Sequence, residues 1–218
     1  MIFEFYQIVI AAIVIMFIPI VKIPFKMLSV YFHELGHGIM AILTGGGIDK
    51  IVLNANGSGV CHFRYRNELF HFFIALAGYL TTSGVGYYIY YTSRVNSEMI
   101  TIENLYVILG AIFVSILLWV RDAKTFFLVL VMAMLFAIPV ADHFLEQIDV
   151  TQYTVSYMQL IGVFIMLDGL ISPLHLIDGG DDGDGGDLES MTRIPEGFWI
   201  ALWLGVAAFA LYSAYTLG

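Results

Sequence analysis

The sequence predicts an all-α polytopic membrane protein with about six to seven transmembrane helices and a small β-hairpin inserted after one of them. The first observation is composition: 60% of the 218 residues are hydrophobic, 12% are charged, and the mean hydropathy is +0.86. Soluble domains are about half apolar and about a quarter charged, so this composition excludes an ordinary soluble domain. The other two observations are a series of long apolar runs and one change to a strand-like pattern at residues 45–67. We expect a single membrane-embedded domain over residues 1–218.

Seven apolar segments are the candidate spans, and prolines, glycines or charged residues separate them. Pro19 and Pro24 end the first segment, Gly45-Gly46-Gly47 ends the second, and Pro195 opens the last. A full crossing takes about 20 residues, so the second, fourth and fifth segments are short for one. In chain order the predicted segments are residues 5–21, 27–44, 69–91, 105–120, 125–140, 151–177 and 197–217.

Residues 45–67 are predicted to form a β-hairpin. Residues 48–53 and 60–65 are rich in β-branched or aromatic side chains, and Asn54-Ala55-Asn56-Gly57-Ser58-Gly59 between them is typical of a turn. A two-stranded hairpin leaves a free edge, which could hold an unwound peptide as an added strand.

An H-E-x-x-H motif, His33-Glu34-Leu35-Gly36-His37, lies within the second apolar segment. Residues four apart share one face of a helix, so both imidazoles can reach a single zinc ion. Glu34 would lie beside the metal, where its carboxylate can accept a proton from water. Ionisable side chains are costly in a hydrocarbon environment, so in this setting the motif indicates a metallopeptidase site.

A third zinc ligand must come from elsewhere in the chain, because catalytic zinc sites usually combine three protein ligands with one open position. Cys61 is the only cysteine, which excludes a cysteine cage. Asp168 ranks first, because a carboxylate in an apolar segment needs a metal or a hydrogen-bonding partner. Asp184 and then Asp178 are the alternatives.

Asp184 and Asp178 belong to an acidic, glycine-rich loop predicted at residues 178–189, where much of the net charge of −9 is concentrated. Such a run is usually a solvated connector. It also matches the spacing of a calcium-binding loop, except that Gly180 stands where a third-position ligand is required. Basic residues are few and scattered, so the sequence does not support nucleic-acid binding.

The motif His33-Glu34-Leu35-Gly36-His37, the hairpin after it and Ala77-Gly78-Tyr79-Leu80 resemble the site-2-protease class of membrane zinc metallopeptidases. The similarity is greatest to the compact branch of that class, which has no appended PDZ domain. In the class, the glutamate of the motif is the base and a later Leu-Asp-Gly motif supplies the third zinc ligand. The resemblance therefore implies roles for Glu34 and for Asp168 in Leu167-Asp168-Gly169.

The compact branch also tends to carry Ser-Asp-Ala before Thr-x-Ile-Pro and a tryptophan in the last span. Thr192-Arg193-Ile194-Pro195 and Trp199 are similar, and Asp184 stands at the corresponding place with glycine on both sides. Asp178, in Ile177-Asp178-Gly179-Gly180, lies in a second sequence that resembles the Leu-Asp-Gly ligand motif. The resemblance covers roughly residues 27–90 and 162–203.

We therefore expect an intramembrane zinc metalloprotease in which Glu34 is the base and His33, His37 and an aspartate hold Zn²⁺. Its partners would be a membrane-anchored protein substrate and the lipid bilayer, and it would be a multi-pass protein of a bacterial inner membrane. The alternative is a non-proteolytic metal-binding transporter or scaffold, which would need the metal ligands but not Glu34.

Overall fold

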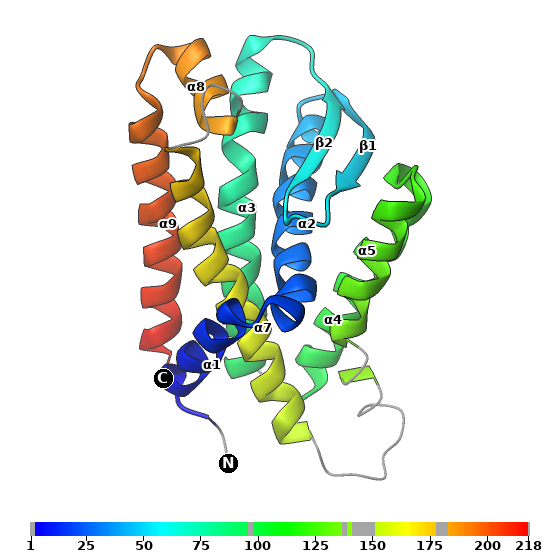
Figure 1. Ribbon diagram of the computed structural model, residues 1–218, viewed down its shortest axis with the longest axis vertical. Helices are drawn as coiled ribbons and strands as arrows, with labels where there is room; N and C mark the ends of the chain where they lie inside the picture. Colours follow the sequence, from blue (N-terminus) through cyan, green and yellow to red (C-terminus); the bar gives the residue numbers. More distant parts are fainter. Residues whose placement is uncertain (1–2, 96–97, 137–138, 141–150, 178–182, 218) are drawn as a thin grey trace.

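The computed structural model describes residues 3–95, 98–136, 139–140, 151–177 and 183–217. Helices dominate, and one two-stranded sheet interrupts them (Figure 1). The elements are α1 (Phe5–Phe17), α2 (Pro19–Leu43), β1 (Gly47–Leu53), β2 (Gly59–Arg64), α3 (Glu68–Val95), α4 (Glu98–Trp119), α5 (Ala123–Ala133), the 3-10 helix η1 (Met134–Phe136), α7 (Thr151–Ile171), the 3-10 helix η2 (Ser172–Leu176), α8 (Asp184–Thr192) and α9 (Glu196–Thr216).

Within the described residues, three helices are long and apolar enough to cross a membrane: Glu68–Val95, Thr154–Leu176 and Glu196–Thr216. A fourth crossing is available if α1 and α2, which are bent by 108° at their junction, count as one broken span. The segments predicted at 105–120 and 125–140 form the shorter apolar helices Leu105–Trp119 and Ala123–Phe136. A mostly helical chain with three or four candidate membrane spans is thus confirmed for the described residues, while the count of six to seven spans stays a prediction.

The first bend lies earlier in the chain than the sequence predicts. Ile18 has extended backbone, with φ −101° and ψ 100°, because a residue before proline disfavours the helical region. Pro19 then occupies the first turn of α2, where a missing N–H costs nothing, and Pro24 lies inside the helix. One helix therefore runs from Pro19 through the H-E-x-x-H motif, and the predicted boundary near residues 21–27 is wrong.

The predicted hairpin is confirmed. β1 and β2 are antiparallel, with Ile51 opposite Cys61 and an irregularity in pairing near Ile48. Its turn is closed by a 2.8 Å hydrogen bond from the Asn54 N–H to the Ser58 carbonyl, and Gly57 has φ 88°. β1 contacts α2, α4 and α5, whereas β2 contacts α2, and its Phe63 packs against His71 of α3.

The centre of the bundle is the contact between α3 and α7. A Cβ atom on Gly86 would lie 2.9 Å from the Gly162 carbonyl oxygen, and one on Gly162 would lie 2.7 Å from the Gly86 carbonyl oxygen. The two backbones therefore touch, which only glycine permits. Gly84, in contrast, has no neighbouring atom within 4 Å of such a Cβ.

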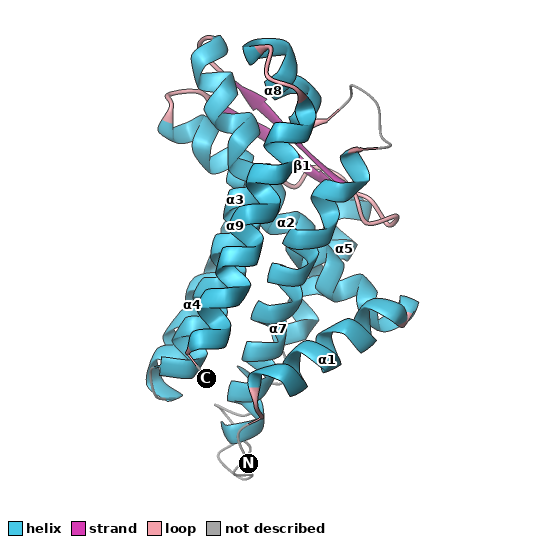
Figure 2. Cartoon of the chain, turned by 90° about the vertical axis from the view of Figure 1, so that its left-hand side faces the viewer, coloured by secondary structure: helices cyan, strands magenta, loops and turns pink. Residues whose placement is uncertain are grey.

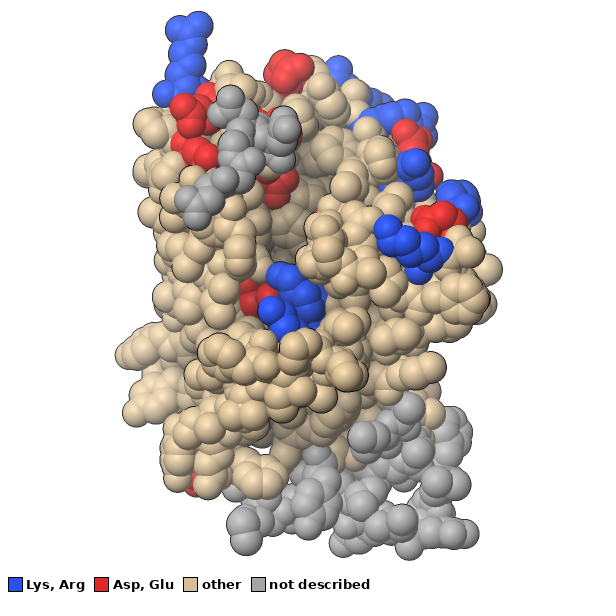
Figure 3. Space-filling view, viewed as in Figure 1, with Lys and Arg blue, Asp and Glu red and all other residues tan. Residues whose placement is uncertain are grey.

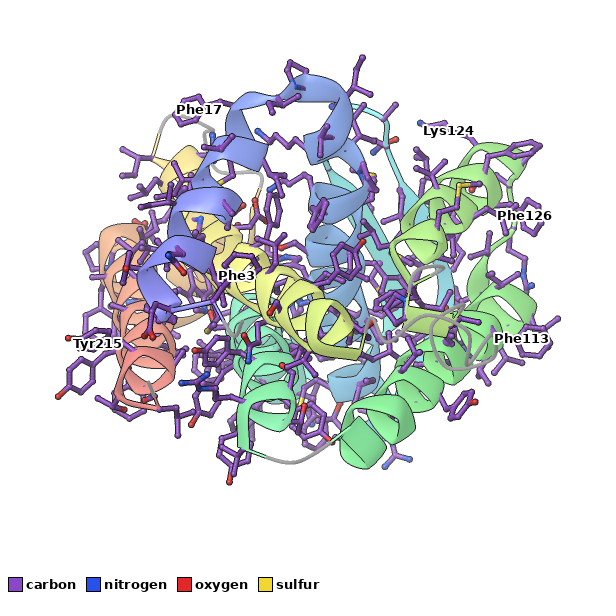
Figure 4. The ribbon with its side chains drawn as sticks, turned by 90° about the horizontal axis from the view of Figure 1, so that it is seen from below. Phe3, Phe17, Phe113, Lys124, Phe126 and Tyr215 are labelled. Atoms are coloured by element: carbon purple, nitrogen blue, oxygen red, sulfur yellow. The ribbon has the colours of Figure 1, made fainter. Side chains whose placement is uncertain are left out.

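The hairpin and α8 lie at one end of the bundle, and both termini lie toward the other (Figure 1, Figure 2). α1 runs across the lower part of the bundle at a steep angle to the long helices (Figure 2). Aromatic side chains such as Phe17, Phe113 and Tyr215 point outward and are 81%, 61% and 63% exposed (Figure 4). An outer surface of this kind suits contact with lipid.

Candidate active site

The H-E-x-x-H motif is helical, as predicted, and lies in the second half of α2. His33 and His37 are one turn apart, with their Nε2 atoms separated by 3.1 Å. His37 is buried and His33 is partly exposed. The spacing seen in the sequence therefore places both nitrogens close enough together to bind one metal ion.

Asp184, the first residue of α8, brings a carboxylate to this point. Its Oδ2 atom is 3.1 Å from His33 Nε2 and 3.3 Å from His37 Nε2. In a tetrahedral zinc site with bonds of about 2.0–2.2 Å, ligand atoms lie about 3.3–3.5 Å apart. The three atoms thus form a triangle of nearly the size that one zinc ion requires. Among the described residues, this trio is the single group of histidine, cysteine and acidic side chains arranged to hold a metal.

Both histidine rings are fixed by α3. His37 Nδ1 is 2.7 Å from the carbonyl oxygen of Ile74, so Nδ1 carries the proton and donates it, which leaves the Nε2 lone pair free for a metal. The ring of Tyr79 packs edge-on against His33, with centroids 4.4 Å apart. Gly78 lies directly beneath the pair: a Cβ there would be 2.5 Å from His37 Nε2 and 2.6 Å from His33 Cε1.

The carboxyl of Asp184 has the charge state that a ligand needs. Burial by itself raises its pKa, but the charges of His37 and His33 and their hydrogen bonds outweigh that effect and hold the pKa well below its usual range. α8 begins at this residue, after extended backbone at Gly183, so residues 184–189 of the predicted acidic loop are helical. The part of that loop at 178–182, including the candidate Asp178, lies outside the described residues.

Asp168, the first-ranked ligand in the sequence, is not brought to the histidines. Its two carboxylate oxygens accept hydrogen bonds from the Lys26 ammonium at 2.9 and 3.0 Å. Ser29 and Ser172 donate further bonds at 2.6 and 3.2 Å. The expectation that a buried carboxylate needs a partner was sound, but Lys26, about two turns before the motif, supplies it.

Glu34 is buried, with 6% of its surface exposed, and it faces the hairpin. The backbone of Cys61 contributes a hydrogen bond to its carboxylate. Gly59 also lies against this side chain, because a Cβ there would be 2.7 Å from Glu34 Cγ and 2.8 Å from Glu34 Oε1. β2 therefore holds the candidate base in position, a role that the turn chemistry of the sequence did not reveal.

One cavity of about 1170 Å³ connects these groups. It is bounded by α2, the hairpin, the end of α7 and the start of α8, and it appears as a hollow in the face shown in Figure 3. The candidate metal ligands lie at one part of the cavity, and Lys22 and Lys26, near the start of α2, line another. The arrangement can bind a metal, move a proton through Glu34 and admit an extended chain.

The residues that the sequence analysis overlooked are Gly78, Gly59 and Lys26. Gly78 lies in Ala77-Gly78-Tyr79-Leu80, a run that carried the family resemblance, so that motif was the signal that could have found it. Lys26 belongs to no motif that could have found it.

Comparison with protein families agrees with the geometry. A family model described as Peptidase M50B-like matches residues 6–214, so the chain belongs to that family and the site-2-protease resemblance is confirmed. The family and the apolar helices together identify an integral membrane metallopeptidase. Neither the search of curated proteins nor that of solved structures found a match.

Proposed function

We propose that this member of the Peptidase M50B-like family is an intramembrane zinc metalloprotease that hydrolyses peptide bonds of membrane-anchored proteins. The observation that carries the proposal is the meeting of His33, His37 and Asp184 within 3.3 Å of one another. Glu34 lines the same cavity. The protein would act as a multi-pass protein of a bacterial inner membrane.

Zinc fits the donor set of two imidazole nitrogens and one carboxylate oxygen. The two Nε2 atoms and an Asp184 oxygen would hold the ion, with Ile74 and Gly78 behind the histidines. When bound, zinc would supply Lewis acidity, which activates water near neutral pH and polarises a peptide carbonyl.

Glu34 would be the general base and then the general acid. Its carboxylate accepts a proton from the attacking water and returns that proton to the nitrogen of the leaving amine. The hydrogen bond from the Cys61 backbone and the contact with Gly59 limit the orientations that this side chain can adopt. A base held in this way loses little entropy when it acts.

β2 would bind the substrate backbone. Gly59, Val60, Cys61 and Phe63 of β2 line the cavity, and the sheet has two strands within the described residues, so β2 keeps a free edge there. A transmembrane helix already satisfies its own backbone hydrogen bonds, so it must unwind before cleavage. Pairing with β2 would replace the bonds that unwinding breaks.

Replacement of Glu34 by Gln tests the proposal. Gln keeps the shape of the side chain but cannot act as the base, so cleavage of a transmembrane substrate should fall roughly 10²- to 10⁴-fold. Zinc content, measured by mass spectrometry on the purified protein, should stay at the wild-type level. Glu68→Gln, at an exposed carboxylate outside the cavity, is the matched control and should cleave normally.

A metal-binding transporter or scaffold makes the opposite prediction. Such a protein needs the ligands but not a base, so Glu34→Gln would leave its function intact. A wild-type protein that holds zinc but cuts no membrane-anchored substrate would favour that alternative.

A further inference from the structure

Among the described residues that line the active-site cavity, Lys22 is the one charged side chain without an ion-pair partner or a place beside the candidate metal ligands. This side chain is partly buried and lines the cavity near the start of α2. Within the part of the chain that the structure describes, no acidic side chain forms an ion pair with it.

The other charged groups in the cavity wall are accounted for. Lys26 pairs with Asp168 and also donates to Ser172 at 2.7 Å, so its three N–H bonds are used. Asp184 lies with the histidines, and Asp187 is 3.5 Å from His71. Glu34 lies three turns along α2 from Lys22, about 18 Å away. Among the described residues, none of the acidic side chains in the cavity wall is thus available to Lys22, and its ammonium group is open to a carboxylate brought by a bound peptide.

The setting favours such a carboxylate. Hydrophobic side chains around the corner between α1 and α2 are exposed, among them Phe17 at 81% and Ile20 at 83%. On the face in Figure 3, blue and red atoms also meet at the hollow, surrounded by residues that carry no charge. An ammonium group in apolar surroundings is stabilised when a counter-charge reaches it, and the same holds for a carboxylate entering that environment.

The distance from the metal ligands sets where that carboxylate would be. His33 follows Lys22 by three turns of the same helix, a separation of about 16 Å along its axis. An extended peptide advances about 3.3 Å per residue, so this distance corresponds to about five residues. The His33 side chain leans back toward the N-terminus of the helix and the flexible lysine adds its own reach, which gives a range of about three to five.

We propose that Lys22 binds an aspartate or glutamate side chain of the substrate, three to five residues from the bond that is cleaved. The site thus selects membrane-anchored substrates with an acidic residue near the cleavage point. This inference rests on the proposed protease function, because it concerns the substrate of that reaction. Its binding test does not require cleavage. A lipid phosphate could offer similar chemistry, so the experiment must separate the two sources.

The experiment uses full-length protein in a phospholipid-free neutral detergent. A series of model transmembrane substrates carries Glu, Gln or Lys at each position from two to six residues on either side of the cleavage site. Cleavage is measured with wild type, Lys22→Gln and Lys22→Glu, and with Lys50→Gln as a control at an exposed lysine outside the cavity. Binding of the same peptides is measured in the Glu34→Gln background, where turnover is not required.

We expect wild type and Lys50→Gln to prefer Glu over Gln roughly tenfold in kcat/KM at one register, as one partly desolvated charge pair can give. Lys22→Gln should lose that preference, and Lys22→Glu should favour Lys at the same position. The inference is overturned if wild type shows no register with an acid preference, or if the preference survives in Lys22→Gln. It is also overturned if the preference appears only after anionic phospholipid is added, because the lipid would then be the ligand.

The two proposals fail in different ways. If no substrate is cleaved but Glu peptides still bind more tightly in a Lys22-dependent manner, the protease proposal fails and the carboxylate site stands. If neutral substrates are cleaved without any acid preference, the protease stands and the role of Lys22 is rejected.

Discussion

At the scale of single residues, the histidine pair is fixed from two sides. Ile74 holds the proton of His37 on Nδ1, and Gly78 leaves the space that both rings occupy. A hydrogen bond behind a metal-binding histidine sets its tautomer and orientation, and its loss typically lowers metal affinity about 10- to 100-fold. The site therefore depends on α3 as much as on the motif itself.

Gly78→Ala tests this dependence. The added methyl group would lie 2.5 Å from His37 Nε2 and 2.6 Å from His33 Cε1, well inside van der Waals contact. The two Nε2 atoms should therefore separate, and zinc affinity should fall at least about tenfold. Gly84→Ala is the matched control, because it lies on the same helix with open space around it. Competition with a zinc chelator measures both variants. Equal affinity in the two would show that Gly78 does not support the site.

The choice among the aspartates also belongs to this scale. The sequence predicts His33, His37 and Glu34 from local spacing alone, since one helical turn fixes their relation. It ranked Asp168 above Asp184, and local spacing could not test that order, because each carboxylate reaches its partner over more than a hundred residues of chain. An apolar neighbourhood shows that Asp168 needs a partner, but it does not show that Lys26 is that partner.

At the scale of elements, α2 and α7 are joined by Lys26 and Asp168. Four hydrogen bonds to the Asp168 carboxylate come from Lys26, Ser29 and Ser172. The pair lies in the cavity wall, where Lys26 and Asp168 side chains are 19% and 9% exposed. It therefore holds the first half of α2 against the end of α7.

Lys26→Met should destabilise the protein by about 3 kcal/mol, because removal of one partner leaves a buried charge unpaired. The double variant Lys26→Met with Asp168→Leu should regain most of that loss, since no charge is then stranded. Thermal unfolding in detergent measures both, with Lys50→Met as an exposed-lysine control. A single variant as stable as the wild type would show that the pair does not hold the helices.

The local elements were predictable to different degrees. The hairpin followed from its turn residues and β-branched runs, which act over a few positions. The position of the first bend did not, because Pro19 and Pro24 both suggest an end and only packing decides which proline stays inside a helix. The start of α8 at Asp184 was also missed, since glycine-rich acidic sequence favours a loop when it is read alone.

At the scale of the whole molecule, an apolar outer surface surrounds a cavity in which the ionisable side chains of the candidate site gather. The described residues include three candidate spans, or four with the bent pair, and the cavity lies beside them between α2, α7, α8 and the hairpin. The membrane class follows from composition, which averages over the whole chain. The number of crossings does not, because helices such as Leu105–Trp119 are apolar but short.

The central claim is that Asp184, rather than Asp168, completes a zinc site with His33 and His37. Zinc content per folded chain, measured on the wild type, Asp184→Asn and Asp168→Asn after size-exclusion chromatography in detergent, tests it most directly. The account predicts about one zinc in the wild type and in Asp168→Asn, and loss of zinc in Asp184→Asn. Retention of zinc by Asp184→Asn together with its loss from Asp168→Asn would contradict the account.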